Sequence, residues 1–304
     1  MDVKTPTDPA RGAGEDEPVH PPVTSFFDAA THTISHVVRD PDSRACAIID
    51  PVLDFDYAAG AIAYRSAEQL IAHIESEGLE LHWLIETHVH ADHLSAAPYL
   101  QARLGGRIGI GAGVLVVQDT FGKVFNEGTE FERDGSQFDR LFEDDDTYTV
   151  GTLEARVMHT PGHTPACTVH VMGDVAFVGD TLFMPDGGTA RADFPGGDAR
   201  TLYRSISRLL ALPPETRLFM CHDYGPNGRE IRWETTVAAE RAENVHVGAG
   251  VSEDDFVARR EARDATLGMP SLIIPALQVN MRGGRLPEPD DSGRRQLKVP
   301  LGGL

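Results

Sequence analysis

The feature that most constrains this chain is a cluster of metal-binding side chains directly after an apolar, strand-like run. His88, His90, Asp92 and His93 lie within six residues and follow residues 81–85. Burying three unpaired imidazoles and a carboxylate at the end of a strand would cost several kcal/mol, so packing explains the cluster poorly. Imidazole and carboxylate ligands together favour zinc, iron or manganese over calcium or magnesium. The cluster therefore predicts a site for one or two metal ions.

Three further polar motifs also follow runs that are typical of strands. They contain His163 in a Pro-Gly-His turn, Asp180 in a Gly-Asp-Thr turn, and His222 after residues 218–221. A lone histidine is more often a surface residue or a satisfied core residue, so none of these motifs identifies a ligand by itself. Because each motif stands where a strand-like run stops, we expect all four to project from one edge of the sheets.

The order of the elements favours a mixed α/β fold, in which two sheets pack face to face with helices outside. Strand-like runs precede helical patterns twice along the chain. The first series is residues 33–39, 45–49 and 79–85 before a helix at 95–104; the second is four runs between residues 147 and 178 before a helix at 198–212. This order predicts a four-layer αββα sandwich.

Local signals define several other predicted elements. Ser66 and Gln69 resemble a capping box at the start of a helix, and Gly78 is a suitable residue to end it. Helices are also predicted at residues 231–244 and 252–266. The Pro- and Gly-rich segment after residue 271 is expected to wrap around the body of the protein.

The chain of 304 residues is long enough for one or two domains. Residues 1–22 are rich in proline and acids, and we expect them to form a disordered tail. Residues 23–245 carry all four metal motifs and are predicted to be the catalytic domain. Residues 246–304 are predicted to be a C-terminal helical and irregular extension that packs on this domain.

Composition excludes several classes of partner and compartment. The formal net charge of -20 argues against nucleic acid or an anionic membrane as the main partner. No stretch reaches the roughly 18 apolar residues of a membrane-spanning helix, and the start has no signal-peptide pattern. The three cysteines are widely spaced and form no disulfide framework. A cytoplasmic location is therefore expected.

The four motifs, in this order, resemble the ligand series of the metallo-β-lactamase superfamily. The similarity covers roughly residues 24–245, and the fold of that superfamily is the αββα sandwich with the metal at the sheet edge. In its hydrolytic members the matching seven residues hold two metals, bridged by the residue that matches Asp180. Because all seven residues are present here, the sequence leaves a site with one metal and a site with two metals both open.

Within this superfamily the chain resembles the persulfide dioxygenases, also called sulfur dioxygenases. The motifs that carry this similarity are residues 180–183, 188–194, 197–203 and 222–224, and residues 272–282 resemble a bacterial branch. The resemblance implies one Fe(II) held by His88, His163 and Asp180, with open positions for substrate and O2. The other four residues, His90, Asp92, His93 and His222, would then orient ligands and move protons, or hold a second metal.

The resemblance implies an iron-dependent dioxygenase that oxidises glutathione persulfide with O2 to sulfite and glutathione. Arg191 and Tyr224 match positions near the substrate, and Arg191 would take a carboxylate in a two-pronged contact. Asp193 would support the site by holding a metal-ligating histidine. Structural alternatives stay open: Arg191 would form an ion pair with Asp193, and Tyr224 would only pack. Dimers are common among such relatives, so a homodimer is also open.

The main alternative is a thioester hydrolase similar to glyoxalase II, with one or two Zn(II) ions and a metal-bound hydroxide as nucleophile. Residues 188–194 and the C-terminal segment argue against it, but the metal motif alone does not. A lactonase has no specific support in the sequence. A non-catalytic metal-binding or redox-sensing module is the alternative from another class, and the complete ligand set argues against it.

Overall fold

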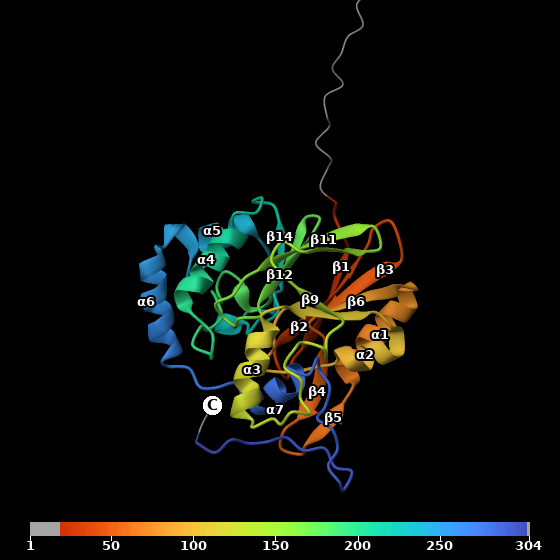
Figure 1. Ribbon diagram of the computed structural model, residues 1–304. Coiled ribbons are helices and arrows are strands. Elements are labelled where there is room, and N and C mark those ends of the chain that lie inside the picture. Colours follow the sequence, from red (N-terminus) through yellow and green to blue (C-terminus); the bar gives the residue numbers. More distant parts are fainter. Residues whose placement is uncertain (1–18, 303–304) are drawn as a thin grey trace, which may run out of the picture.

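The computed structural model describes residues 19–302 and consists of two six-stranded sheets packed face to face (Figure 1). In spatial order, the first sheet is β1 (Val23–Asp28), β2 (Thr33–Arg39), β3 (Ala45–Ile49), β6 (Glu80–Glu86), β8 (Arg107–Gly111) and β9 (Arg140–Phe142). The second is β10 (Thr147–Val150), β11 (Leu153–His159), β12 (Thr168–Met172), β13 (Val175–Phe177), β14 (Arg217–Phe219) and β15 (Glu234–Thr236). A small third sheet has the order β5 (Ala61–Ala63), β4 (Val52–Asp56), β7 (Leu94–Ser95).

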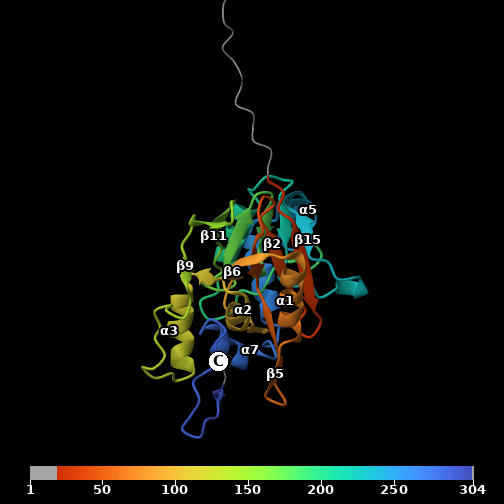
Figure 2. The same ribbon diagram turned by 90° about the vertical axis from the view of Figure 1, so that its right-hand side faces the viewer.

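Helices cover the outer face of each large sheet. The first sheet is covered by α1 (Arg65–Glu77), α2 (Ala97–Leu104) and α3 (Val114–Val124), and the second by α4 (Ala199–Leu209), α5 (Val237–Glu243) and α6 (Glu253–Asp264). The last helix, α7 (Ile273–Asn280), lies at the same end of the molecule as α3 and the β4–β5 hairpin (Figures 1 and 2). The predicted αββα sandwich is confirmed.

Alternating side chains on each strand build the layers of the core. On β3, Cys46 and Ile48 point into the cluster shared with the outer helices α1–α3, whereas Ala47 and Ile49 point into the cluster between the sheets. All four side chains are fully or almost fully buried. Strands that are buried on both faces have continuous apolar sequences, and residues 45–49 have such a sequence.

The strand directions bring the metal motifs to one edge. Strands β3, β6 and β8 are parallel, so residues 50 and 87 follow neighbouring strands at the same sheet edge. In the second sheet β13 and β14 are parallel, and β11 points the same way because β12 is antiparallel to both β11 and β13. The chain therefore leaves β11, β13 and β14 at a common edge, just before His163, Asp180 and His222.

Some predicted elements differ from the structure. Ser66 is not an N-cap: α1 begins at Arg65, and the Ser66 hydroxyl instead donates to the side chains of Asp28 and Asp54. Gly78 ends the helix in the left-handed region, as predicted, with φ of 62°.

Two further differences lie in the C-terminal half. The helix predicted at residues 231–244 begins only at Val237, because residues 234–236 pair with β14 as an edge strand. The Thr236 hydroxyl then caps the helix by accepting from the backbone N–H of Ala239. The segment after residue 271 is not only an irregular wrapping: it contains α7, most of whose side chains are buried.

Most of the predicted N-terminal tail, residues 1–18, lies outside the described residues. Residues 19–22 contact the body, which differs from the prediction for them. The carbonyl of Val19 accepts from Asp174, and the carbonyl of Pro22 accepts from Arg39. Within residues 19–302, no helix has the length and apolar character to cross a bilayer.

Candidate metal centre

The predicted ligands His88, His163 and Asp180 come together at the sheet edge. The ligand atoms of these residues lie within 4.8 Å of one another. Asp180 Oδ2 is 3.5 Å from His163 Nε2 and 3.9 Å from His88 Nε2. Two imidazoles and one carboxylate thus face a common point.

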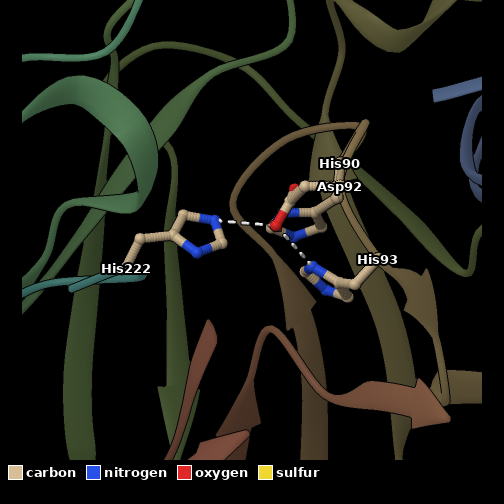
Figure 3. Close-up of side chains that lie close together, drawn as sticks. All are labelled: His90, Asp92, His93 and His222. Atoms are coloured by element: carbon tan, nitrogen blue, oxygen red, sulfur yellow. Dashed lines mark hydrogen bonds and ion pairs between the residues drawn. The ribbon is translucent and has the colours of Figure 1, made fainter. Parts of the chain in front are cut away.

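The other four predicted residues form a second group beside the first. Ligand atoms of His90, Asp92, His93 and His222 also lie within 4.8 Å of one another. Asp92 Oδ2 is 3.3 Å from His222 Nε2 and 3.5 Å from His93 Nδ1, so its carboxylate points between the two rings (Figure 3). Asp180 connects the groups, because its Oδ1 lies 3.4 Å from His222 Nε2.

Two glycines allow the chain to place the ligands that follow them. Gly162 has φ of 133°, and a Cβ there would lie 2.3 Å from the backbone nitrogen of Leu202 at the start of α4. Gly179 has φ of 51°, and a Cβ there would lie 2.6 Å from the Thr87 hydroxyl. Both positions need glycine, for backbone conformation and for space.

The donor atoms fit a bound metal. Among the described residues, several buried side-chain atoms of the two ligand groups have no hydrogen-bond partner: Nε2 of His88, His93 and His222, Nδ1 of His90, and Oδ1 of Asp180. An unsatisfied buried polar atom costs about 1–3 kcal/mol, so such a concentration is unfavourable unless a ligand uses the lone pairs. Imidazole and carboxylate donors of this kind bind transition-metal ions such as iron or zinc.

Backbone carbonyls orient two of the imidazoles. His163 Nδ1 donates to the carbonyl of Arg191 at 2.7 Å, and His222 Nδ1 donates to the carbonyl of His32 at 3.2 Å. Each bond places the proton on Nδ1 and leaves the Nε2 lone pair directed at the centre. Burial, together with the neighbouring His90 and His163, holds the pKa of His88 well below its usual range. His88 is therefore neutral, the form that binds a metal.

Asp50 is a further residue of the centre that sequence reasoning missed. It is buried with φ of 50°, and its carboxylate accepts from the backbone and hydroxyl of Thr87 and from His90 Nε2, the last at 2.9 Å. Burial opposes a charge on His90, but Asp50 and Glu86 outweigh it and raise the pKa of the imidazole. The one feature that could have identified Asp50 is its position directly after β3, which is parallel to β6 and so ends at the same sheet edge.

A cavity of about 560 Å³ leads to the centre. Its walls include Asp92, His163 and Asp180, together with the apolar side chains of Phe183 and Phe194. This size is within the range of small-molecule sites, and one side of the proposed metal ligands faces it. Tyr224 also lines the cavity; its ring lies parallel to that of His222, with centroids 6.0 Å apart and an angle of 15°.

Arg191 and Asp193 bind each other in the cavity wall. The guanidinium Nε and Nη2 donate to the two carboxylate oxygens of Asp193 at 2.6 and 2.7 Å, and Nη1 donates to the carbonyl of Gly268 at 2.7 Å. This geometry corresponds to the alternative that the sequence left open, a structural ion pair between Arg191 and Asp193. Asp193 was predicted to hold a metal-ligating histidine. In the structure the backbone carbonyl of Arg191, and not the Asp193 carboxylate, accepts from His163.

Helix α6 supplies two more arginines to the cavity wall, and sequence reasoning missed both. Arg260 is buried and bound by Asp264 and the carbonyl of Thr189. Arg263 is exposed and has no ion pair with any carboxylate in residues 19–302. Among the described arginines that line this wall, Arg263 is therefore the one without an ion pair, and it can meet an anionic ligand.

Comparison with known proteins places the chain in a family. The model of the metallo-beta-lactamase superfamily matches residues 31–222. A probable metallo-hydrolase of Burkholderia pseudomallei is 61% identical over an alignment of 289 positions, which covers 92% of this chain and 98% of that protein. Glyoxylase B2 of Dictyostelium discoideum is 46% identical over 278 residues, 91% of this chain and 95% of the relative.

Two further matches share the name ETHE1. The mitochondrial persulfide dioxygenase ETHE1 of Homo sapiens is 31% identical over 262 residues, 85% of this chain and 87% of the human protein. The crystal structure of ETHE1 from Myxococcus xanthus superposes with a TM-score of 0.69 at 28% identity, covering 86% of this chain and 99% of that one. With this fold, this ligand set and these matches, the chain belongs to the metallo-β-lactamase superfamily.

Proposed function

We propose that this protein is an iron-dependent persulfide dioxygenase, which oxidises glutathione persulfide with O2 to sulfite and glutathione. The observation that carries the proposal is the group His88, His163 and Asp180, two of whose members line the cavity. Two histidines and one carboxylate on one face are typical of non-haem Fe(II) oxygenases. The similarity to persulfide dioxygenases over 85% or more of this chain supports the same function.

In this proposal, His88, His163 and Asp180 would hold the iron, which would supply the chemistry that brings the persulfide sulfur and O2 together. The protein contributes the rest: the apolar rings of Phe183 and Phe194 limit water around the sulfur, and Arg263 attracts the anionic substrate. His222 and Asp92, 3.3 Å apart, are placed to hold and move protons beside the reacting sulfur.

A metal-dependent thioester hydrolase is the second candidate. It is favoured by the group His90, Asp92, His93 and His222, which offers a second set of ligand atoms. It is also favoured by relatives named as a probable metallo-hydrolase and as glyoxylase B2, which are more similar in sequence than the persulfide dioxygenases. Two metals in such a centre would supply a bound hydroxide and polarise the thioester carbonyl.

One experiment separates the two candidates. The metal-free protein is loaded anaerobically with Fe(II) or with Zn(II), and each form is tested with glutathione persulfide and with S-lactoylglutathione. We expect the form with one iron per chain to consume O2 and release sulfite in equal amounts, and the zinc form to consume no O2. Absence of O2 uptake, together with rapid thioester cleavage by a form with two zinc ions, would overturn the proposal.

Replacing Arg263 with alanine is expected to raise the KM for glutathione persulfide about tenfold, with kcat little changed. A charge-assisted contact contributes about 1.5 kcal/mol, and one made equally with substrate and transition state affects KM alone. Arg259→Ala is the matched control, since Arg259 is exposed on the same helix but does not line the cavity. Steady-state O2 uptake measures both constants, and equal effects of the two substitutions would contradict a specific contact.

A further inference from the structure

The C-terminal helix α7 is hydrogen-bonded to the metal-binding loop through the buried side chain of Asn280. Its amide nitrogen Nδ2 donates to the carbonyls of His90 and His93, at 2.9 and 2.7 Å. Its amide oxygen Oδ1 accepts from the backbone N–H of Ser95 at 2.8 Å. With 5% of its surface exposed, Asn280 makes these contacts away from solvent.

The three backbone groups bound by Asn280 belong to the loop that carries half of the centre. His90 and His93 are themselves members of the second ligand group, and Asp92 lies between them. A carboxamide has two donors and an acceptor in one plane, so it fixes both carbonyls and the N–H relative to one another. The backbone path from residue 90 to 95 in turn determines where these imidazoles point.

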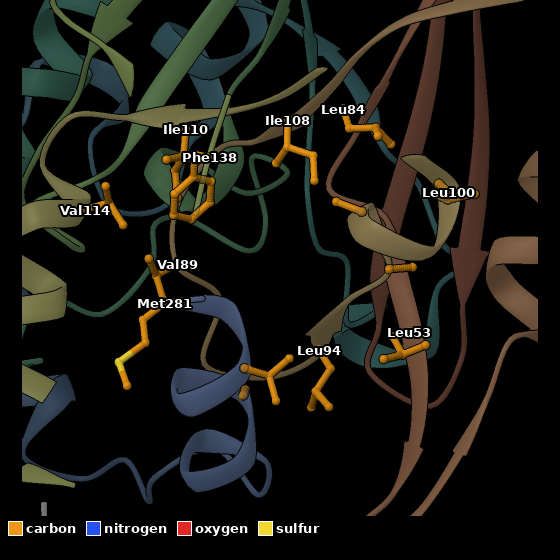
Figure 4. Close-up of a cluster of buried hydrophobic side chains, with 14 of the residues drawn as sticks. Leu53, Leu84, Val89, Leu94, Leu100, Ile108, Ile110, Val114, Phe138 and Met281 are labelled. Carbon is orange, nitrogen blue, oxygen red and sulfur yellow. The ribbon is translucent and has the colours of Figure 1, made fainter. Parts of the chain in front are cut away.

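The position of Asn280 is itself fixed by apolar packing. Its neighbour Met281 and, one turn earlier, Leu277 belong to the same buried cluster as Val89 and Leu94, which flank the metal-binding residues. Figure 4 shows Met281, Val89 and Leu94 gathered around the end of α7. The helix thus presents the carboxamide to the loop in a prearranged position, which lowers the entropy cost of holding the loop.

We propose that Asn280 is a positioning residue for the metal centre. It acts through the loop backbone and keeps His90, Asp92 and His93 in the arrangement that binds a metal or supports its ligands. The segment at residues 272–282, which takes no direct part in either candidate reaction, would then serve to position the metal-binding loop. The proposal holds for one metal or two, and for a dioxygenase or a hydrolase.

The test compares metal binding by Asn280→Leu with that of a control on the same helix, Gln278→Leu. Gln278 is equally buried, but its side chain bonds to Ile274 and to both backbone groups of Lys298 and does not touch the loop. Co(II) affinity is measured by competition with a chelator, together with the visible spectrum of the bound Co(II). Urea unfolding of the metal-free variants reports their stability independently.

For Asn280→Leu we expect an affinity loss of at least about tenfold and an altered Co(II) spectrum, as for other partners that orient metal ligands. Gln278→Leu is expected to lose stability but to keep the wild-type affinity and spectrum. If Asn280→Leu does not fold, Asn280→Asp, which retains an acceptor for Ser95 but loses the amide donors, replaces it in the comparison. Wild-type affinity and spectrum in the Asn280 variant, or equal losses in the Gln278 control, would overturn the proposal.

Discussion

Asp180→Ala is expected to remove both the bound metal and the activity. The two oxygens of the Asp180 carboxylate face the two ligand groups, one toward His88 and His163 and the other toward His222. Its loss leaves the first group with two imidazoles and no anion to balance the charge of the metal. The fall in metal affinity should exceed the 10–100-fold that is typical for loss of an outer partner of a ligand.

The measurements are elemental analysis of the purified variant and its rate of O2 uptake with glutathione persulfide. Asp186→Ala is a suitable control, because Asp186 lies in the same loop but pairs with Arg229 at the surface. We expect this control to keep its metal. A fully metallated and active Asp180→Ala protein would contradict the assignment of Asp180 as a ligand.

The part of the site that could be predicted from the sequence is the part built from short turns after strands. His163 and Asp180 each follow a glycine at the end of an apolar run, and parallel strand order alone brings such turns to one edge. The same reasoning predicted the sandwich, because the strands and helices occur as two separate series. Local pattern and tertiary position agree at these residues, so sequence is a sufficient guide there.

The rest of the site depends on contacts between residues that are distant in the sequence. Asp50 and Asn280 have no motif of their own; each becomes important only because folding places it beside the loop at residues 87–95. Tertiary contacts also override local signals. Ser66 has the sequence of an N-cap, but the carboxylates of Asp28 and Asp54 offer its hydroxyl other acceptors.

The role of Arg191 in the cavity wall likewise could not be predicted from local sequence. The sequence suggested a two-pronged contact of Arg191 with a substrate carboxylate; in the structure Arg191 lines the cavity and makes its bidentate contact with Asp193, two residues along the chain. Which arginine is left free depends on how α6 packs against the loop. This packing is visible only in three dimensions, and it moves the expected substrate contact to Arg263.

The largest loss of stability is expected when the buried ion pair within α6, whose two side chains also bond to the cavity loop, is broken. Arg260 and Asp264 are 2% and 5% exposed, with Arg260 Nη2 at 2.6 Å from Asp264 Oδ1. Asp264→Ala would leave the guanidinium buried without a counter-charge. Removing one member of such a pair costs about 3–5 kcal/mol, which urea unfolding of the metal-free protein can measure. A loss below about 1 kcal/mol would show that Arg260 reaches solvent in the variant.

A double variant, Arg260→Met with Asp264→Leu, separates the cost of the unpaired charge from the loss of the loop contacts. The pair also binds the backbone of the cavity loop, since Arg260 Nη1 donates to the Thr189 carbonyl and Asp264 Oδ2 accepts from the N–H of Ala192. Apolar replacement removes the buried charges but leaves these two groups unpaired, at about 1–3 kcal/mol each. Asp264→Ala also leaves the Ala192 N–H unpaired, so the double variant differs from it by losing the unpaired charge and the Thr189 contact. We therefore expect the double variant to be more stable than Asp264→Ala but less stable than wild type. If it instead matched wild type, the loop would be held without these bonds; if it were less stable than Asp264→Ala, the loop contacts would outweigh the buried charge.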